Sequence, residues 1–135
     1  MSLSNFLELE LLDHVFKQTV YAVPDRVAIA LSTADPSEAG TNIAEPAAGA
    51  YTRVKCLTTG ADWNVAAAGA MDNASIFTFP TATASWGTIT HFALYDATGT
   101  GLGNMLGYAA LTTARDVTIG DTVKFAAGDL DISMT

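Results

Sequence analysis

The side chains that could act in acid–base or nucleophilic chemistry are few and lie far apart in the sequence. His14 and His91 are the two histidines of the 135-residue chain, and Cys56 is its single cysteine. A catalytic site needs a nucleophile beside a base, or two groups that exchange protons, within hydrogen-bond reach. The chain also lacks a G-x-S-x-G motif. We therefore interpret the two histidines and Cys56 as structural residues, predict no catalytic residue, and expect a protein that is not an enzyme.

Sequence patterns that could indicate a cofactor or metal site lack the neighbouring structure that such a site needs. Gly99, Gly101 and Gly103 form a G-x-G-x-G run between two expected strands, and no expected helix follows them. A dinucleotide-binding loop opens a helix. The aspartates lie mostly at expected turns, where Asp accepts local backbone hydrogen bonds, and no twelve-residue calcium loop is present. The sequence thus predicts no cofactor and no metal site, although calcium bound by converging turns stays open as an alternative.

Charge and hydropathy limit the partners. The chain has 6 Lys and Arg against 14 Asp and Glu, for a net charge of −8. Binding to nucleic acid needs clustered basic residues, and anionic membranes repel an acidic surface, so neither partner is expected. Half of the residues are hydrophobic and only 15% are charged. This balance favours a surface partly covered by other chains, with a tightly packed monomer as the alternative.

The N-terminal residues 1–17 predict an amphipathic helix of about 13 residues. Asn5 followed by Glu8 has the spacing of a capping box. Apolar residues recur with helical spacing and include Phe6, Leu7, Leu11 and Val15. The apolar face that they form is too wide to be covered by one edge of a β-sandwich. We therefore predict that this helix is a docking or oligomerisation element. The start has no basic region followed by a long apolar run, so we expect no signal peptide and synthesis in the cytoplasm.

From residue 26 onward the pattern changes to the alternation of β-strands. About eight short strands are expected, at residues 26–32, 51–58, 75–79, 88–96, 104–112, 117–119, 122–126 and 130–134. Those at 117–119 and 122–126 are expected to form a hairpin. Turn residues separate the strands, as is typical of a β-sandwich or jelly roll. The predicted fold is all-β, with a helix over 1–17 and one β-sandwich domain over 26–135.

The strand pattern also predicts which individual side chains lie in the core. In the strand at 88–96, alternation places Ile89 on the opposite face from Phe92. Phe92 and Trp86 are expected in the core, and Cys56 is expected to be a small core residue. Trp63 and Trp86 are interpreted as buried anchors, although aromatic side chains on an exposed loop would instead favour sugar binding.

The segment 33–50 is a long loop without periodicity between two expected strands. Loops of this length persist in compact domains when they contact something. Ile43 and Pro46 near its end are candidates for such a contact. We expect this loop to lie against a neighbouring copy or another protein in a symmetric ring, with a trimer as the first guess by analogy.

Several segments together resemble a family of small bacteriophage proteins that are usually described as tail fibre proteins. They span nearly the whole chain and lie at residues 1–8, 11–16, 30–36, 45–54, 76–92, 108–113 and 120–130. The alanine-rich stretch at 65–71 departs from the family pattern. The resemblance implies a virion structural protein of a tailed phage, made in the host cytoplasm, and it brings no catalytic residues.

The functional hypothesis is a tail- or fibre-associated protein that self-associates and docks onto tail, baseplate or major capsid proteins. Its expected interface residues are Phe6, Leu7, Leu11, Val15, Ile43 and Pro46. A capsid decoration protein that stabilises the head is the alternative, and a carbohydrate-binding module for the host surface is the third hypothesis.

Overall fold

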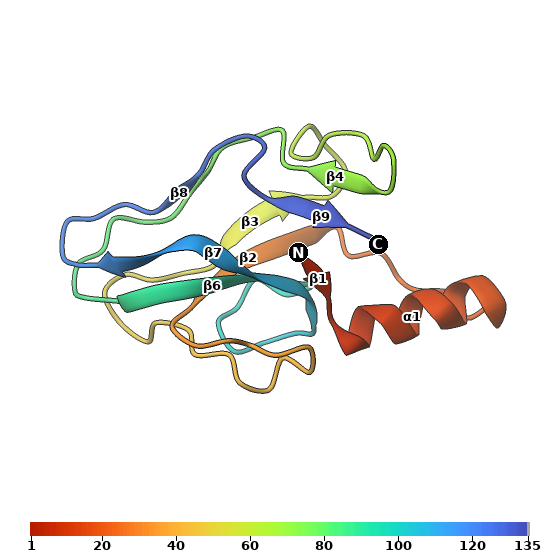
Figure 1. The fold of residues 1–135 in the computed structure, drawn as a ribbon, viewed down its shortest axis with the longest axis horizontal. Helices are drawn as coiled ribbons and strands as arrows, with labels where there is room; N and C mark the ends of the chain where they lie inside the picture. Colours follow the sequence, from red (N-terminus) through yellow and green to blue (C-terminus); the bar gives the residue numbers. More distant parts are fainter. Residues whose placement is uncertain (135) are drawn as a thin grey trace.

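The computed structural model describes residues 1–134, which form one helix and nine strands (Figure 1). In chain order these are β1 (Ser2–Leu3), α1 (Asn5–Phe16), β2 (Arg26–Ser32), β3 (Val54–Leu57), β4 (Ala70–Asp72), β5 (Phe77–Thr78), β6 (Gly87–Tyr95), β7 (Met105–Val117), β8 (Lys124–Phe125) and β9 (Asp131–Ser133). The predicted all-β fold with one N-terminal helix is confirmed. The last residue of the predicted β domain, Thr135, lies outside the described residues.

Five strands form one antiparallel sheet in the order β1-β7-β6-β2-β3. Two short ribbons, β4-β9 and β5-β8, lie over one face of this sheet, and the loops that follow β2 and β6 lie on the opposite side (Figure 1). Ile29 of β2 pairs with both Val54 of β3 and Leu94 of β6. β2 is therefore a central strand, which explains why six of its seven residues are buried.

The main core lies between the sheet and the two ribbons. Aromatic rings fill it: the Phe92 and Phe125 centroids are 5.3 Å apart, and Phe79 packs edge-on against Trp86 at 6.4 Å. Such tilted and edge-to-face pairs are the favoured geometries for aromatic side chains. Trp86, Phe92 and Cys56 are buried, as predicted.

A smaller core lies on the opposite face of the same sheet. Ala30, Ala93, Tyr95 and Met105 are buried there, and Ile43 of the long loop packs against them. The small alanines on β2 and β6 let the loop backbone approach the sheet closely. Burial on both faces hides the simple alternation that marks a half-exposed strand.

A bulge between β6 and β7 corrects the predicted faces of β6. His91 pairs with Ala110 and Ile89 with Arg115, so residues 111–114 of β7 oppose the single residue Thr90. A bulge changes which face a side chain takes. Ile89 consequently joins Phe92 in the main core instead of lying on the opposite face, as alternation had predicted.

The hairpin predicted over residues 117–126 is wrong. β7 continues to Val117, and β8 pairs with β5 through Phe77–Phe125 and Thr78–Lys124. The turn after Val117 is closed by Asp121, whose carboxylate accepts a hydrogen bond from the Thr118 amide at 2.8 Å. The strands β1 and β4, of two and three residues, were not predicted because they are too short to show a pattern.

Candidate interaction surface

The N-terminal helix is fixed to the sheet by Ser4, which is its N-cap in place of the predicted Asn5. The Ser4 hydroxyl accepts a hydrogen bond from the Leu7 amide at 3.2 Å and donates one to the Met105 carbonyl. The Ser4 amide donates to the Leu106 carbonyl at 3.0 Å. β1 pairs with β7 just before this point. The base of α1 is therefore held rigidly against the start of β7.

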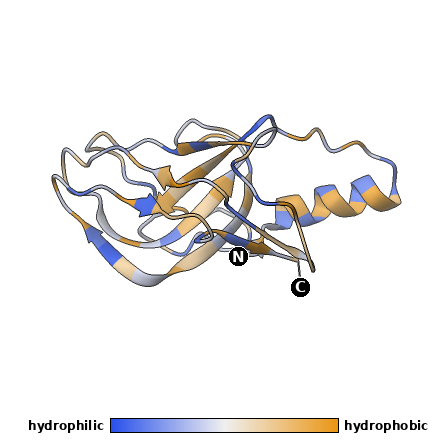
Figure 2. Ribbon diagram, turned by 90° about the horizontal axis from the view of Figure 1, so that it is seen from above, coloured by the Kyte–Doolittle hydropathy of each residue, from blue (hydrophilic) through white to orange (hydrophobic). Residues whose placement is uncertain are grey.

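Beyond its first turn, α1 projects away from the body of the molecule (Figures 1 and 2). None of its twelve residues is buried. Phe6 and Leu7 pack partly against the main core, and Leu11 is half-buried. The side turned to solvent carries large apolar side chains, with exposures of 65% for Leu9, 54% for Leu12, 64% for Val15 and 79% for Phe16. A surface helix ordinarily turns its apolar side chains toward the core and its polar side chains toward solvent.

The chain that returns from α1 to β2 is also apolar and exposed. We call residues 5–25, the helix and this return segment, the arm. Val20 and Val23 in the return segment are 79% and 76% exposed. The arm contains six of the twelve exposed large hydrophobic residues among the described residues. Exposed apolar residues in this concentration mark an interaction site.

Hydrogen bonds order the turn at the tip of the arm. The amides of Lys17 and Thr19 both donate to the Asp13 carbonyl, at 3.0 and 3.2 Å. The Tyr21 amide donates to Nδ1 of His14 at 3.2 Å. His14 is thus a structural residue that joins the return segment to the helix. His91 likewise lies 2.8 Å from the Thr90 hydroxyl on β6.

The predicted interface residues lie in two separate places. Val15 is on the exposed side of the arm, Leu11 is half-buried, and Phe6 and Leu7 face the body. Leu9, Leu12 and Phe16, which are exposed on the helix, were not among the predicted interface residues. The available signal was that apolar residues occur on every side of the helix.

Ile43 and Pro46 lie in the loop 33–53, which makes its contacts within its own chain. Pro46 is buried, and Ile43 packs in the smaller core. The Ala44 amide donates to the Ser32 hydroxyl at 3.0 Å, and the Trp86 indole donates to the Gly49 carbonyl at 2.9 Å. The length of this loop is therefore explained by intrachain packing, and a neighbouring copy against it stays a prediction.

A buried ion pair, which the sequence analysis missed, ties this loop to the β6–β7 turn. Nη2 of Arg53 lies 2.6 Å from Oε1 of Glu45, with side-chain exposures of 0% and 5%. Nη1 of Arg53 donates to the Ala97 and Leu102 carbonyls at 2.9 and 2.8 Å. The guanidinium also lies over the Tyr95 ring, 3.8 Å from its centroid.

The protonation states around this ion pair follow from burial and hydrogen bonding. Burial alone would raise the pKa of the Glu45 carboxyl, but hydrogen bonds from Arg53 and the Gly101 amide, together with the Arg53 charge, lower it below the usual range. Burial raises the pKa of the Tyr51 hydroxyl, which donates to Glu45 at 2.9 Å. This arrangement is a structural crosslink between two loops, because every strong donor is already directed at an acceptor.

A groove between β7 and β8 is the second candidate surface. It has a volume of about 450 Å³. Apolar side chains from Phe92, Leu111, Val123 and Phe125 line its floor, and Arg115, Lys124 and Asp129 lie on its rim. The β7 bulge at residues 111–114 forms one wall.

Groups for metal chemistry are not gathered in residues 1–134. Within that range, no three His, Cys, Asp or Glu side chains are placed to hold a metal ion.

Burial raises the pKa of the Cys56 thiol to about 12, with a further contribution from Asp62. No helix in residues 1–134 is long and apolar enough to cross a membrane.

Comparison with known proteins identifies the family. The family model described as podophage GP4 fiber I protein gp80 matches residues 2–133. The chain belongs to this family. The resemblance to phage tail fibre proteins is therefore confirmed, and the protein is a phage fibre protein and a virion component. No curated protein matches the sequence.

Membership in a fibre family means association with other virion proteins. Of the two tryptophans considered for sugar binding, Trp86 is buried, and Trp63 packs against Phe77 with ring centroids 6.1 Å apart. Trp86 is therefore not available to bind a sugar, whereas Trp63 is half-buried. The arm thus holds half of the exposed large hydrophobic residues in the described part of this fibre protein.

Proposed function

We propose that this fibre protein assembles into the virion through its arm, which docks onto further copies and onto other virion proteins. The observation that carries the proposal is the exposed apolar side of α1, formed by Leu9, Leu12, Val15 and Phe16. Both cores of the body are complete without these side chains. Their exposure therefore serves contact with another chain and not the fold of this one.

The energetics favour a strong contact. Full burial of one large aliphatic or aromatic side chain contributes about 1.5–3 kcal/mol. Six such residues on the arm supply enough apolar surface to offset the entropy lost on association. The ordered turn at Asp13 and His14 reduces the loss further, because the arm is already structured before it binds.

Polar substitution on the exposed side of the arm tests the proposal. The double variant Leu12→Gln/Phe16→Gln is compared with Val65→Gln/Ile119→Gln, which alters two exposed apolar residues in loops outside the arm. Sedimentation of the purified proteins and their incorporation into phage particles are measured. We expect the arm variant to lose incorporation and the control to keep it. Normal incorporation of the arm variant would contradict the proposal.

Copy number in purified particles tests the fibre position in the same preparations. A fibre component is expected in small numbers, set by the number of fibres. Hundreds of copies would instead favour the capsid decoration hypothesis. Quantitative mass spectrometry against the major capsid protein distinguishes the two.

A further inference from the structure

The arm and the groove between β7 and β8 have complementary chemistry. The arm carries Glu8, Glu10, Asp13 and Asp25 against a single lysine, four negative charges and one positive, for a net charge of −3. The groove has an apolar floor and two basic residues, Arg115 and Lys124, against one acidic residue, Asp129. An acidic helix with an apolar face fits an apolar groove with a basic rim.

This groove is distinguished from other hollows on the described surface by its charge. Four other hollows are lined by balanced or net acidic sets of residues. One of them adjoins the groove and shares Arg115 and Lys124, which Asp116 and Asp121 balance there. Arg115 and Lys124 are exposed, and within residues 1–134 neither forms an ion pair. In a chain of net charge −8, two exposed basic residues beside an apolar groove are a specific feature.

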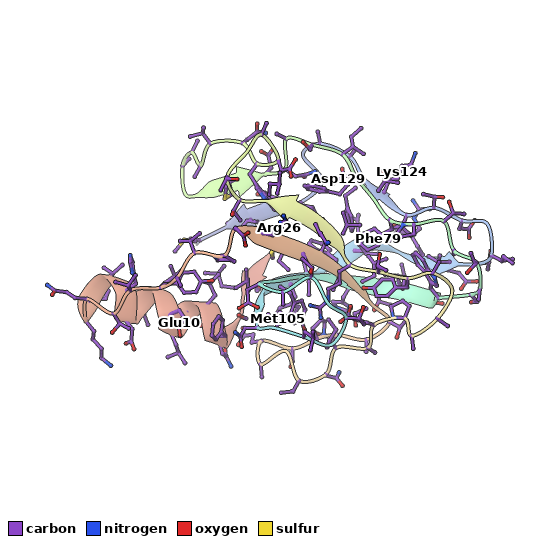
Figure 3. The ribbon with its side chains drawn as sticks, turned by 180° about the vertical axis from the view of Figure 1, so that it is seen from behind. Glu10, Arg26, Phe79, Met105, Lys124 and Asp129 are labelled. Atoms are coloured by element: carbon purple, nitrogen blue, oxygen red, sulfur yellow. The ribbon has the colours of Figure 1, made fainter. Side chains whose placement is uncertain are left out.

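The two surfaces lie at opposite ends of the molecule. In Figure 3, Glu10 on the arm lies toward the left of the view and Lys124 on the groove rim lies toward the right, with the body of the molecule between them. One copy cannot therefore place its own arm in its own groove. Contact between two arms is also disfavoured, because it would bring together two segments that each carry a net charge of −3.

We propose that the arm of one copy docks into the β7–β8 groove of the next copy, so that the fibre protein associates head to tail. The inference rests on the proposed function, because it names the surface that the arm binds when it meets a second copy. A head-to-tail contact joins two different surfaces and generates a ring or a filament, according to the rotation at each step. In either assembly one end of every copy is covered by the next.

Three purified full-length variants test the pairing of surfaces. The arm variant is Leu12→Gln/Phe16→Gln, and the groove variant is Arg115→Glu/Lys124→Glu. The control, Arg26→Glu/Lys55→Glu, makes the same charge change at exposed residues of β2 and β3. Sedimentation velocity measures the assembly state of each variant alone and of the arm and groove variants mixed in equal amounts.

Head-to-tail docking predicts a result that symmetric contacts do not give. The arm variant and the groove variant each stay monomeric, with the apparent dissociation constant raised about tenfold or more. Their mixture forms a dimer of two 14.0 kDa chains and stops there, because only one functional arm and one functional groove are present. The control assembles like the unaltered protein.

Other outcomes overturn the inference in distinguishable ways. A groove variant that assembles normally while the arm variant does not would refute the groove and leave the proposed function in place. An unaltered protein that stays monomeric at high concentration, yet enters particles through its arm, would show that the arm binds a different virion protein. An arm variant that assembles and enters particles normally would refute the proposed function itself.

Discussion

Arg53 is a charged residue whose side chain is fully buried. Its guanidinium is fully enclosed and donates to Glu45 and to two backbone carbonyls of the β6–β7 turn. Arg53 and Lys55 are two positions apart, so regular alternation would place them on the same face, and Lys55 is exposed. The burial of Arg53 depends on two loops that fold over that face, and no local pattern reports such a cover.

Replacing Arg53 by leucine is expected to destabilise the fold by about 3–5 kcal/mol, because it leaves the buried Glu45 carboxylate without its counter-charge. Two carbonyls of the β6–β7 turn also lose their donors. Urea unfolding at neutral pH measures the change. Lys55→Leu, an exposed position on β3, is the matched control and should alter the free energy of unfolding by no more than about 0.5 kcal/mol. Equal stabilities of the two variants would contradict the structural role of Arg53.

The lowered pKa of Glu45 predicts acid sensitivity. A carboxyl whose pKa is lower in the folded protein than in the unfolded chain stabilises the fold above the unfolded value, near 4.3 for glutamate. That contribution is lost as the pH falls from there through the folded value. Urea unfolding at a series of pH values should therefore show a steeper loss below about pH 4.3 for the unaltered protein than for Glu45→Gln. Parallel curves would show that Glu45 does not contribute.

At the scale of elements, local patterns predicted where the central strands begin and end, but not which strands pair. The bounds of β2 agree with the prediction at both ends, and β6 differs by one residue. The prediction for β8 failed because its partner is β5, 48 positions away at Phe77 and Phe125, whereas a hairpin was expected from proximity. The prediction for the face of Ile89 failed because the pairing of β6 with β7 is irregular between Ile89 and His91, and regular alternation along β6 is broken there.

The N-cap of α1 gives a test of how the arm is attached. Sequence spacing favoured Asn5, but the cap is Ser4, because its hydroxyl also reaches the Met105 carbonyl on β7. Loss of an N-cap costs about 0.5–2 kcal/mol, and loss of a buried hydrogen bond adds about 1 kcal/mol.

Ser4→Ala should therefore lower the free energy of unfolding by about 1–3 kcal/mol and increase hydrogen exchange in the first turn of α1. Chemical unfolding and amide exchange measure the two effects. Ser2→Ala, at an exposed position of β1, is the control and should leave both unchanged. An unaltered exchange rate in Ser4→Ala would mean that β1 alone fixes the helix.

Over the whole molecule, the body and the arm differ in how much they contribute to the fold. The body completes two cores across one sheet, and segments far apart in the chain build them, as with Ser2 paired to Tyr108. The arm contributes to these cores only through its first turn, where Phe6 and Leu7 pack. Composition indicated a partly covered surface, and the helical pattern indicated the element. Neither could show that the apolar side of the helix faces solvent, because that depends on how the helix leaves the body.

Together with the proposed function, this difference predicts that assembly can be lost without loss of stability. Leu12 and Phe16 are mostly exposed in the single chain, so their replacement by glutamine removes little buried area and should change the free energy of unfolding by no more than about 0.5 kcal/mol. Thermal unfolding of Leu12→Gln/Phe16→Gln is compared with the unaltered protein at a concentration where both are monomeric. Phe92→Ala, a change inside the main core, is expected to cost about 3–5 kcal/mol and shows the sensitivity of the measurement. A large drop in melting temperature for the arm variant would place the arm within the folded core and remove the reason to regard it as a surface kept for other chains.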